Sequence, residues 1–143
     1  MDMYPGAIAG IEEDWETIWE FFDDPENFPD GATVVVNTQY NPFDDCTESY
    51  SGIALTPLKI MLLADYNTVI GDMTAEHANG ALADQYTNFL GHGHLFDNSA
   101  CPHYDASAEY WMSDLIHANS TGHVEGLAVV FEGVADSLYG ECE

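Results

Sequence analysis

Ten carboxylates in the first 50 residues are the side chains whose type and spacing could do chemistry. Grouped carboxylates can chelate a cation, pass a proton, or take the place of phosphate groups at a basic surface. No Lys or Arg lies among them, so we expect them to act on a partner rather than to pair within the chain. They are Glu12, Glu13, Glu16, Glu20, Asp23, Asp24, Asp30, Asp44, Asp45 and Glu48.

The charge of the chain limits its partners. It has 26 acidic residues and one basic residue, Lys59, which gives a formal net charge of −25 over 143 residues. Such a field repels nucleic acid and anionic lipid. We therefore expect no direct binding to DNA or RNA and no binding to membranes. The expected partner is a basic protein surface or a cation.

A histidine-rich loop offers the best candidates for metal ligands. His92 and His94 are separated by one residue, and so are Cys101 and His103. Zinc takes four nitrogen or sulfur ligands in tetrahedral geometry, and neither spacing is a standard zinc motif. The acidic loops also lack the residue order of a calcium-binding EF-hand. These four residues are weak candidates, and we predict neither a metal nor another cofactor.

The sequence lacks the common motifs of enzyme active sites. It contains no GxSxG, no P-loop, no GxGxxG and no HExxH. Paired carboxylates carry little information in a chain with 26 acids. We predict that the protein has no catalytic residues and is not an enzyme.

The cysteines and the N-terminus suggest a cellular location. Cys46, Cys101 and Cys142 are an odd number without CxxC spacing, which favours reduced thiols over a disulfide framework. The sequence shows neither a signal peptide nor an apolar run long enough to span a bilayer. We expect a soluble protein in the cytoplasm of a host cell.

The glutamates are expected on a helix. Ile11, Trp15 and Trp19 recur at helical spacing, which predicts an amphipathic helix over residues 8–22 with an apolar inner face and an anionic outer face. Residues 32–40 are rich in β-branched side chains and are predicted to form a strand.

The middle of the chain is predicted to contain a hairpin and a buried helix. Residues 52–55 are expected to form a second strand that pairs back on the first. Thr56 followed by proline is typical of a helix start, and residues 58–63 are almost wholly apolar, which predicts a buried helix. We expect the amine of Lys59 to reach neighbouring carboxylates.

Three further segments show helical spacing. Helices are predicted over residues 74–90 and 105–118. An amphipathic segment over residues 122–139 is predicted to be helical, with a strand as the alternative. The predicted fold class is α+β and mainly helical, with about five helices and a small β-hairpin or sheet in a single compact domain over residues 1–143.

The acids are most simply explained as imitations of phosphate. B-DNA carries one negative charge per about 1.7 Å of axis, and helix turns repeat every 5.4 Å or so. Acids on helices can therefore be spaced much as phosphates are. A cation on such a surface would spoil the imitation, which accounts for the missing Arg and Lys.

Two short segments carry a resemblance to DNA-mimic antirestriction proteins of phages and plasmids. Residues 100–104, ACPHY, lead into an acidic and aromatic segment with Tyr110, Trp111 and Asp114, which resembles the proline-histidine-tyrosine entry to a helix in Ocr-like proteins. Residues 36–41, VNTQYN, resemble the strand and Tyr-Asn start of ArdA-like proteins, without the glycines that follow there. Acidic anti-CRISPR proteins share the same character. The resemblance implies inhibition of a host defence or DNA-processing enzyme through its basic DNA-binding groove.

Adaptation to high salt is the alternative. An acidic structural or assembly protein of a halophilic virus or organism would also carry many acids and few lysines. Such proteins generally keep arginine and have fewer large apolar residues, and this chain does neither. A homodimer is possible in either case, because it would extend the anionic surface.

Overall fold

The computed structural model describes residues 3–140 of the chain. They contain four α-helices, one π-helical segment and two short strands, and the π-helical segment lies between the last two α-helices. The elements are α1 (Met3–Asp23), β1 (Val34–Asn37), α2 (Pro57–Glu76), β2 (Gly80–Ala83), α3 (Gln85–Phe89), η1 (Gly122–Ala128) and α4 (Val129–Tyr139).

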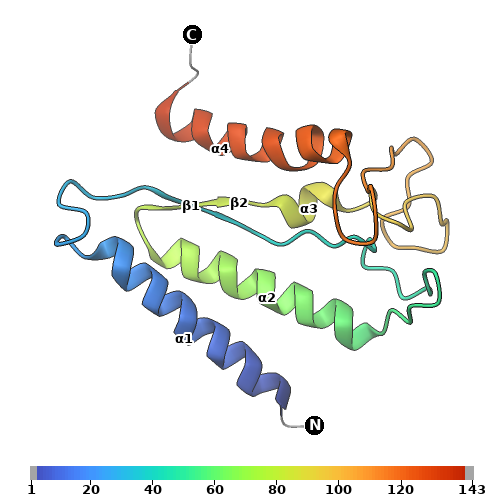
Figure 1. The fold of residues 1–143 in the computed structure, drawn as a ribbon, viewed down its shortest axis with the longest axis horizontal. Helices are drawn as coiled ribbons and strands as arrows, with labels where there is room; N and C mark the ends of the chain where they lie inside the picture. The colour runs from blue at the N-terminus through green and yellow to red at the C-terminus, as the bar shows by residue number, and fades with distance from the viewer. Residues whose placement is uncertain (1–2, 141–143) are drawn as a thin grey trace.

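The elements are stacked in layers (Figure 1). β1 and β2 pair in parallel, with Val34 opposite Gly80 and Asn37 opposite Ala83. α2 covers one face of this pair and α4 packs against β2 from the other side, while α1 lies outside α2. Strands covered on both faces are apolar along their length, which explains the sequences VVVN and GALA.

One core cluster holds α1, α2 and the strands together. Trp19 is only 1% exposed and packs with Val36 and Ile70. Trp15 is half-buried beside them. The helix predicted over residues 8–22 is confirmed, with one tryptophan fully inside and the other at the edge.

The helix predicted over residues 74–90 is wrong. α2 ends at Glu76, and a tight turn then leads into β2. Gly80, the first residue of β2, is needed directly after that turn, because a Cβ there would lie 2.6 Å from the Thr74 carbonyl oxygen and 2.9 Å from the Trp19 ring. The chain therefore gives a second strand where helical spacing predicted a helix.

The predicted hairpin is also wrong, because the sheet is parallel and its second strand is β2. Residues 52–55 contribute only an isolated bridge between Tyr50 and Ile53. The helix after Thr56 is confirmed, but Leu58 and Met61 are more than half exposed, so its first turns are not the buried segment that the sequence predicted.

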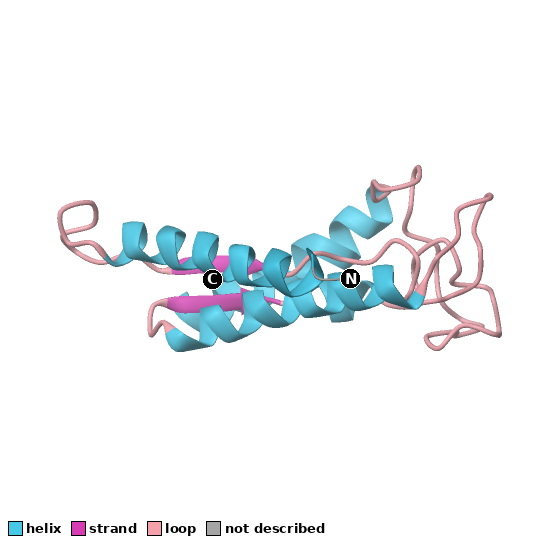
Figure 2. Cartoon of the chain, turned by 90° about the horizontal axis from the view of Figure 1, so that it is seen from below, coloured by secondary structure: helices cyan, strands magenta, loops and turns pink. Residues whose placement is uncertain are grey.

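Residues 105–118 form turns rather than the predicted helix, and Met112 bridges Ala118 across a small loop. This segment and residues 38–56 gather at one end of the molecule (Figure 2). A disulfide joins Cys46, in the second of these segments, to Cys101, which lies just before the first, with the Cα atoms 5.1 Å apart. The expectation of reduced thiols is therefore wrong for these two cysteines. Cys142 lies outside the described residues.

The C-terminal segment is helical, as predicted. It begins with the π-helical turn η1, where Gly126 lies so close to Phe89 that a Cβ would come within 2.9 Å of its ring. Gly140, at φ 78°, ends α4. Phe131 and Leu138 on this helix are 41% and 40% exposed, so its apolar side is not fully buried.

The described residues thus form a mixed fold of helices around a small parallel sheet. Among residues 3–140, no helix combines the length and the apolar character needed to cross a membrane.

Candidate functional site

The outer face of α1 carries four exposed glutamates in a compact group. At 100° and 1.5 Å per residue, they fall within an arc of about 100° and span about 12 Å along the axis. This is roughly one carboxylate per 4 Å, close to the one phosphate per 3.4 Å of a single DNA strand in a duplex. The four are Glu12, Glu13, Glu16 and Glu20, as the sequence predicted for the outer face.

The group of glutamates on α1 continues into a hollow between the C-terminal ends of α1 and α2. The hollow has a volume of about 540 Å³. Five carboxylates line it, four from α1 and the turn after it and one from α2. They are Glu16, Glu20, Asp23, Asp24 and Glu76, and the other lining residues are Pro25, Met73 and His77. A hollow with this lining has the charge to receive the side chain of a Lys or Arg.

Asp23 is held in place at the edge of this hollow. Its Oδ2 accepts a hydrogen bond from Nδ1 of His77 at 2.8 Å, and its Oδ1 accepts one from Nδ2 of Asn79 at 2.9 Å. The His77 ring stacks on Trp19, with the ring centroids 4.2 Å apart. Core packing therefore fixes the position of a surface carboxylate. No local pattern could predict that His77 and Glu76 join this site, because they lie more than 50 residues from Asp23.

Asp24 and Asp30 flank the turn that follows α1. Asp24 is half-buried, and its Oδ1 accepts the backbone N–H of Glu26 at 2.8 Å. Asp30 is exposed. The turn lies at the same end of the molecule as the C-terminal ends of α1 and α2 (Figure 1).

Asp44 is not a surface acid. Its side chain is 1% exposed, and its two oxygens accept three backbone N–H bonds, from Gly91 and Gly93 at 2.9 and 2.8 Å and from Leu95 at 3.1 Å. Burial raises the pKa of the Asp44 carboxyl, while these three bonds act in the opposite direction. The sequence placed Asp44 among the partner-binding acids, and its burial removes it from that surface.

Asp45 is also engaged within the chain. Its Oδ1 accepts a bond from Nδ2 of Asn41 at 2.7 Å, and its Oδ2 accepts one from the Tyr86 hydroxyl at 2.6 Å. Burial and this carboxylate raise the pKa of Tyr86 well above its usual value. Asp45 is half-buried, while Glu48 is exposed. The loop that carries these acids lies at the opposite end of the molecule from the acidic hollow (Figure 1), so the ten predicted acids do not form one surface.

The weak metal candidates are not brought together as ligands. Cys101 is bound to Cys46, and Nε2 of His103 faces Asp45 at 3.4 Å. His92 stacks on Trp111 at 3.5 Å. Among residues 3–140, no group of three or more His, Cys, Asp or Glu side chains is arranged to hold a metal ion.

His94 is a structural residue. It is buried, and its two ring nitrogens are both used. Nε2 donates to the Leu115 carbonyl at 3.2 Å, so in the neutral ring Nδ1 accepts the bond of 2.9 Å from the Tyr110 hydroxyl.

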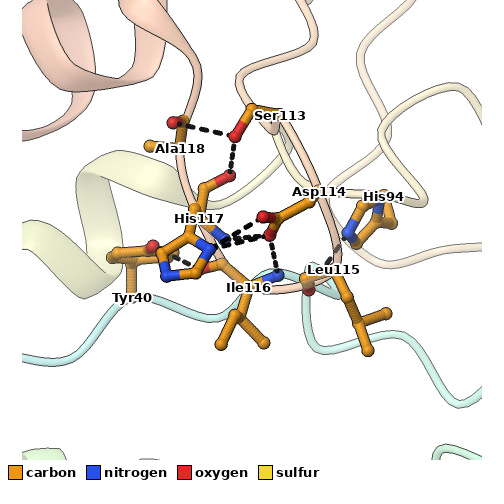
Figure 3. Close-up of polar contacts among 8 residues, drawn as sticks. All are labelled: Tyr40, His94, Ser113, Asp114, Leu115, Ile116, His117 and Ala118. Carbon is orange, nitrogen blue, oxygen red and sulfur yellow. Dashed lines mark hydrogen bonds and ion pairs between the residues drawn. The ribbon is translucent and has the colours of Figure 1, made fainter.

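Ser113, Asp114 and His117 lie together but do not form a catalytic triad (Figure 3). Asp114 contacts Nδ1 of His117 at 2.8 Å, as in a triad. The Ser113 hydroxyl, however, donates to the backbone carbonyl of His117 and not to its ring. Because no base contacts the hydroxyl, these residues do not make an activated nucleophile.

The face of α1 and the adjoining hollow, hereafter the acidic face, are thus the largest group of predicted site residues that the fold brings together. They comprise Glu12, Glu13, Glu16, Glu20, Asp23 and Asp24, with Glu76 added by the structure. No family model, no curated protein and no solved structure matches this chain.

Proposed function

We propose that the protein is a DNA mimic that occupies the basic DNA-binding groove of a host defence or DNA-processing enzyme and inhibits it by competition. The single observation that carries the proposal is the acidic face. Its four glutamates lie along one side of α1 with a mean axial density close to that of the phosphates of one DNA strand, and the hollow beside them is lined by five carboxylates.

The charge of the whole chain supports the same function. Lys59 is the one Lys or Arg in the sequence, and its Nζ donates to the Ala54 carbonyl at 3.0 Å. It therefore neutralises none of the acidic face. A field of this sign attracts a basic groove over long range, speeds association, and weakens as salt screens it.

A fourfold substitution tests the proposal. The wild-type protein is used to capture its target from host lysate in dilute salt, and the proteins released at high salt are identified by mass spectrometry. Affinity for the purified target is then measured for a variant with glutamine at the four α1 positions. Because both charge and spacing are lost, we expect binding to weaken at least tenfold. The substitutions are Glu12→Gln, Glu13→Gln, Glu16→Gln and Glu20→Gln.

A matched variant controls for net charge. It neutralises four exposed acids outside α1 and so changes the charge by the same amount. The substitutions are Asp97→Asn, Glu125→Gln, Glu132→Gln and Asp136→Asn. Equal weakening by both variants would show that total charge alone attracts the partner, and the acidic face would have no special role.

One observation favours the alternative, a structural or assembly protein of a halophilic virus or organism. The Cys46–Cys101 disulfide belongs to an oxidising environment such as a virion surface or the cell exterior. A DNA mimic acts in the cytoplasm of the host cell, where thiols are kept reduced. Free-thiol labelling of the protein taken from its natural source decides between the two environments.

A further inference from the structure

A small loop at the other end of the molecule presents two aliphatic side chains to water. Met112 and Ala118 pair at its base and are buried. Leu115 and Ile116 form its tip and are 43% and 58% exposed. Their side chains point the same way, away from the hydrogen bonds behind them (Figure 3).

The tip is fixed by hydrogen bonds from the rest of the protein. The Tyr40 hydroxyl donates to the Ile116 carbonyl at 2.6 Å, and Nε2 of the buried His94 donates to the Leu115 carbonyl at 3.2 Å. Within the loop, Oδ1 of Asp114 accepts the N–H of Ile116 at 3.0 Å. The two aliphatic side chains are therefore held outward before any partner arrives, which lowers the entropic cost of binding.

An apolar pocket lies directly beside the tip. Its volume is about 320 Å³, in the range of small ligand sites. Leu115 and Ile116 form one wall, and the first turns of α2 and the loop before it form the rest. The other lining residues are Asn41, Pro42, Phe43, Ile53, Leu55, Lys59, Ile60 and Leu63. The pocket is wide enough for one large apolar side chain.

The charge around the pocket differs from that of the acidic face. No Asp or Glu occurs between Ser49 and Ala64, the stretch that supplies half of the lining, and the sole lysine lies in it. The exposed carboxylate of Asp114 stands next to the tip. The pocket itself is apolar, and the carboxylate of Asp114 adds to the negative field of the chain, which attracts an apolar residue that has basic neighbours.

We propose that this pocket and its tip form a hydrophobic anchor that receives a large apolar side chain from the basic partner. The inference rests on the proposed function, which supplies the sign of the partner's charge. A net charge of −25 opposes docking of a second copy or of an amphipathic anion. Desolvated apolar contacts within a charged interface carry much of the binding free energy.

Two synthetic peptides test the anchor. Both are lysine-rich and fluorescein-labelled, and they differ at one central residue, phenylalanine or alanine. Binding to the full chain is followed by fluorescence anisotropy at about 0.05 M and about 0.5 M NaCl. Burial of the ring should make the phenylalanine peptide bind about tenfold more tightly, and this ratio should persist as salt weakens both peptides.

Variants locate the effect. Ile116→Ser and Leu115→Ser should each bring the ratio of the affinities for the phenylalanine and alanine peptides close to one. The affinity for the alanine peptide should not change. Met61→Ser is the matched control, because Met61 is 51% exposed but faces away from the pocket side of α2. It should keep the full ratio. The glutamine variant of the acidic face should weaken both peptides and also keep the ratio.

Each contrary result has a separate meaning. A ratio near one for the wild-type protein, or a full ratio for Ile116→Ser, overturns the anchor and leaves the proposed function in place. If neither lysine peptide binds better than an uncharged peptide of equal length, the proposed function fails. A dimer in light scattering that Ile116→Ser converts to monomer also overturns the anchor, because the occupant would then be a second copy.

Discussion

At the scale of single residues, the predicted acids differ in how far the fold encloses them. Asp44 and Asp45 accept bonds from within the fold. Nothing in the local sequence distinguishes Asp44 from an exposed acid, because its donors lie 47 to 51 residues further along the chain. A pattern read over a few neighbours cannot reveal such partners.

The role of Asp44 predicts a large loss of stability for Asp44→Asn. Asparagine keeps one acceptor oxygen and turns an NH₂ group toward backbone N–H donors, so buried groups are left unsatisfied. We expect the free energy of unfolding to fall by about 2–3 kcal/mol in urea titrations. Asp30→Asn is the control at an exposed acid and should change it by less than about 0.5 kcal/mol. Equal effects would contradict the structural role of Asp44.

Asp114 predicts a pH dependence of the anchor tip. Backbone bonds from Ile116 and His117 and the His117 side chain lower the pKa of this exposed carboxyl from 3.8 to about 2. A lowered pKa in the folded state means that the stabilising contribution is present above pH 3.8 and is lost as the pH falls through about 2.

Carboxyl NMR can follow this titration directly. We expect the Asp114 resonance and the amide proton of Ile116 to titrate together near pH 2, and the amide response to vanish in Asp114→Asn. An Asp114 midpoint close to 3.8 would show that the bonds do not form in solution.

At the scale of elements, α1 was predictable because its apolar residues follow the helical period and its inner face meets a real core. The two tryptophans test how deeply each position on the inner face of α1 is buried. Trp19→Ala should cost about 3–5 kcal/mol, since the ring is 1% exposed. Trp15→Ala should cost roughly half as much, because Trp15 is only half-buried. Chemical denaturation of both variants measures the difference, and equal losses would contradict the packing of α1 against α2.

Two predicted helices failed for identifiable physical reasons. In residues 74–90 the Asn79-Gly80 pair is a turn signal, and a short apolar strand buried on both faces has no alternation to reveal it. In residues 105–118 the side chains of Asp105 and Asp114 accept nearby backbone N–H bonds, which compete with a helix. Helical spacing was present in both segments, and local polar bonds and tertiary packing outweighed it.

At the scale of the whole molecule, the predicted acids separate into the acidic face at one end and Asp44, Asp45 and Glu48 at the other. Only the first belongs to the candidate site. Sequence position suggested one surface because Asp23 and Asp44 are close along the chain, but the segment between them, which includes β1, runs from one end of the molecule to the other (Figure 1). The parallel pairing with β2, and the disulfide that joins residues 55 positions apart, are non-local and could not be read from the sequence.

The net charge of −25 predicts a measurable response to salt. Among the described residues, histidine is the basic partner in the three close contacts of a carboxylate with a basic side chain, and no Lys or Arg takes part in them, so most of the acidic repulsion is uncompensated. Raising KCl from about 0.1 M to about 2 M shortens the screening length several-fold. With a disulfide and tryptophan-rich packing, the protein should be folded in the dilute buffer. We expect its Tm to rise by about 5–10 °C across this range.

Thermal melts followed by circular dichroism, without reductant, make this measurement and separate the two candidate functions. In about 0.1 M KCl, the glutamine variant of the acidic face should have a higher Tm than the wild-type protein, because part of the repulsion is already gone. Added salt should therefore raise its Tm by less. A wild-type protein that is unfolded at about 0.1 M and folds only near 2 M KCl would favour the halophilic structural protein. Its acids would then serve solubility in brine, and the spacing on α1 would lose its meaning as an imitation of phosphate.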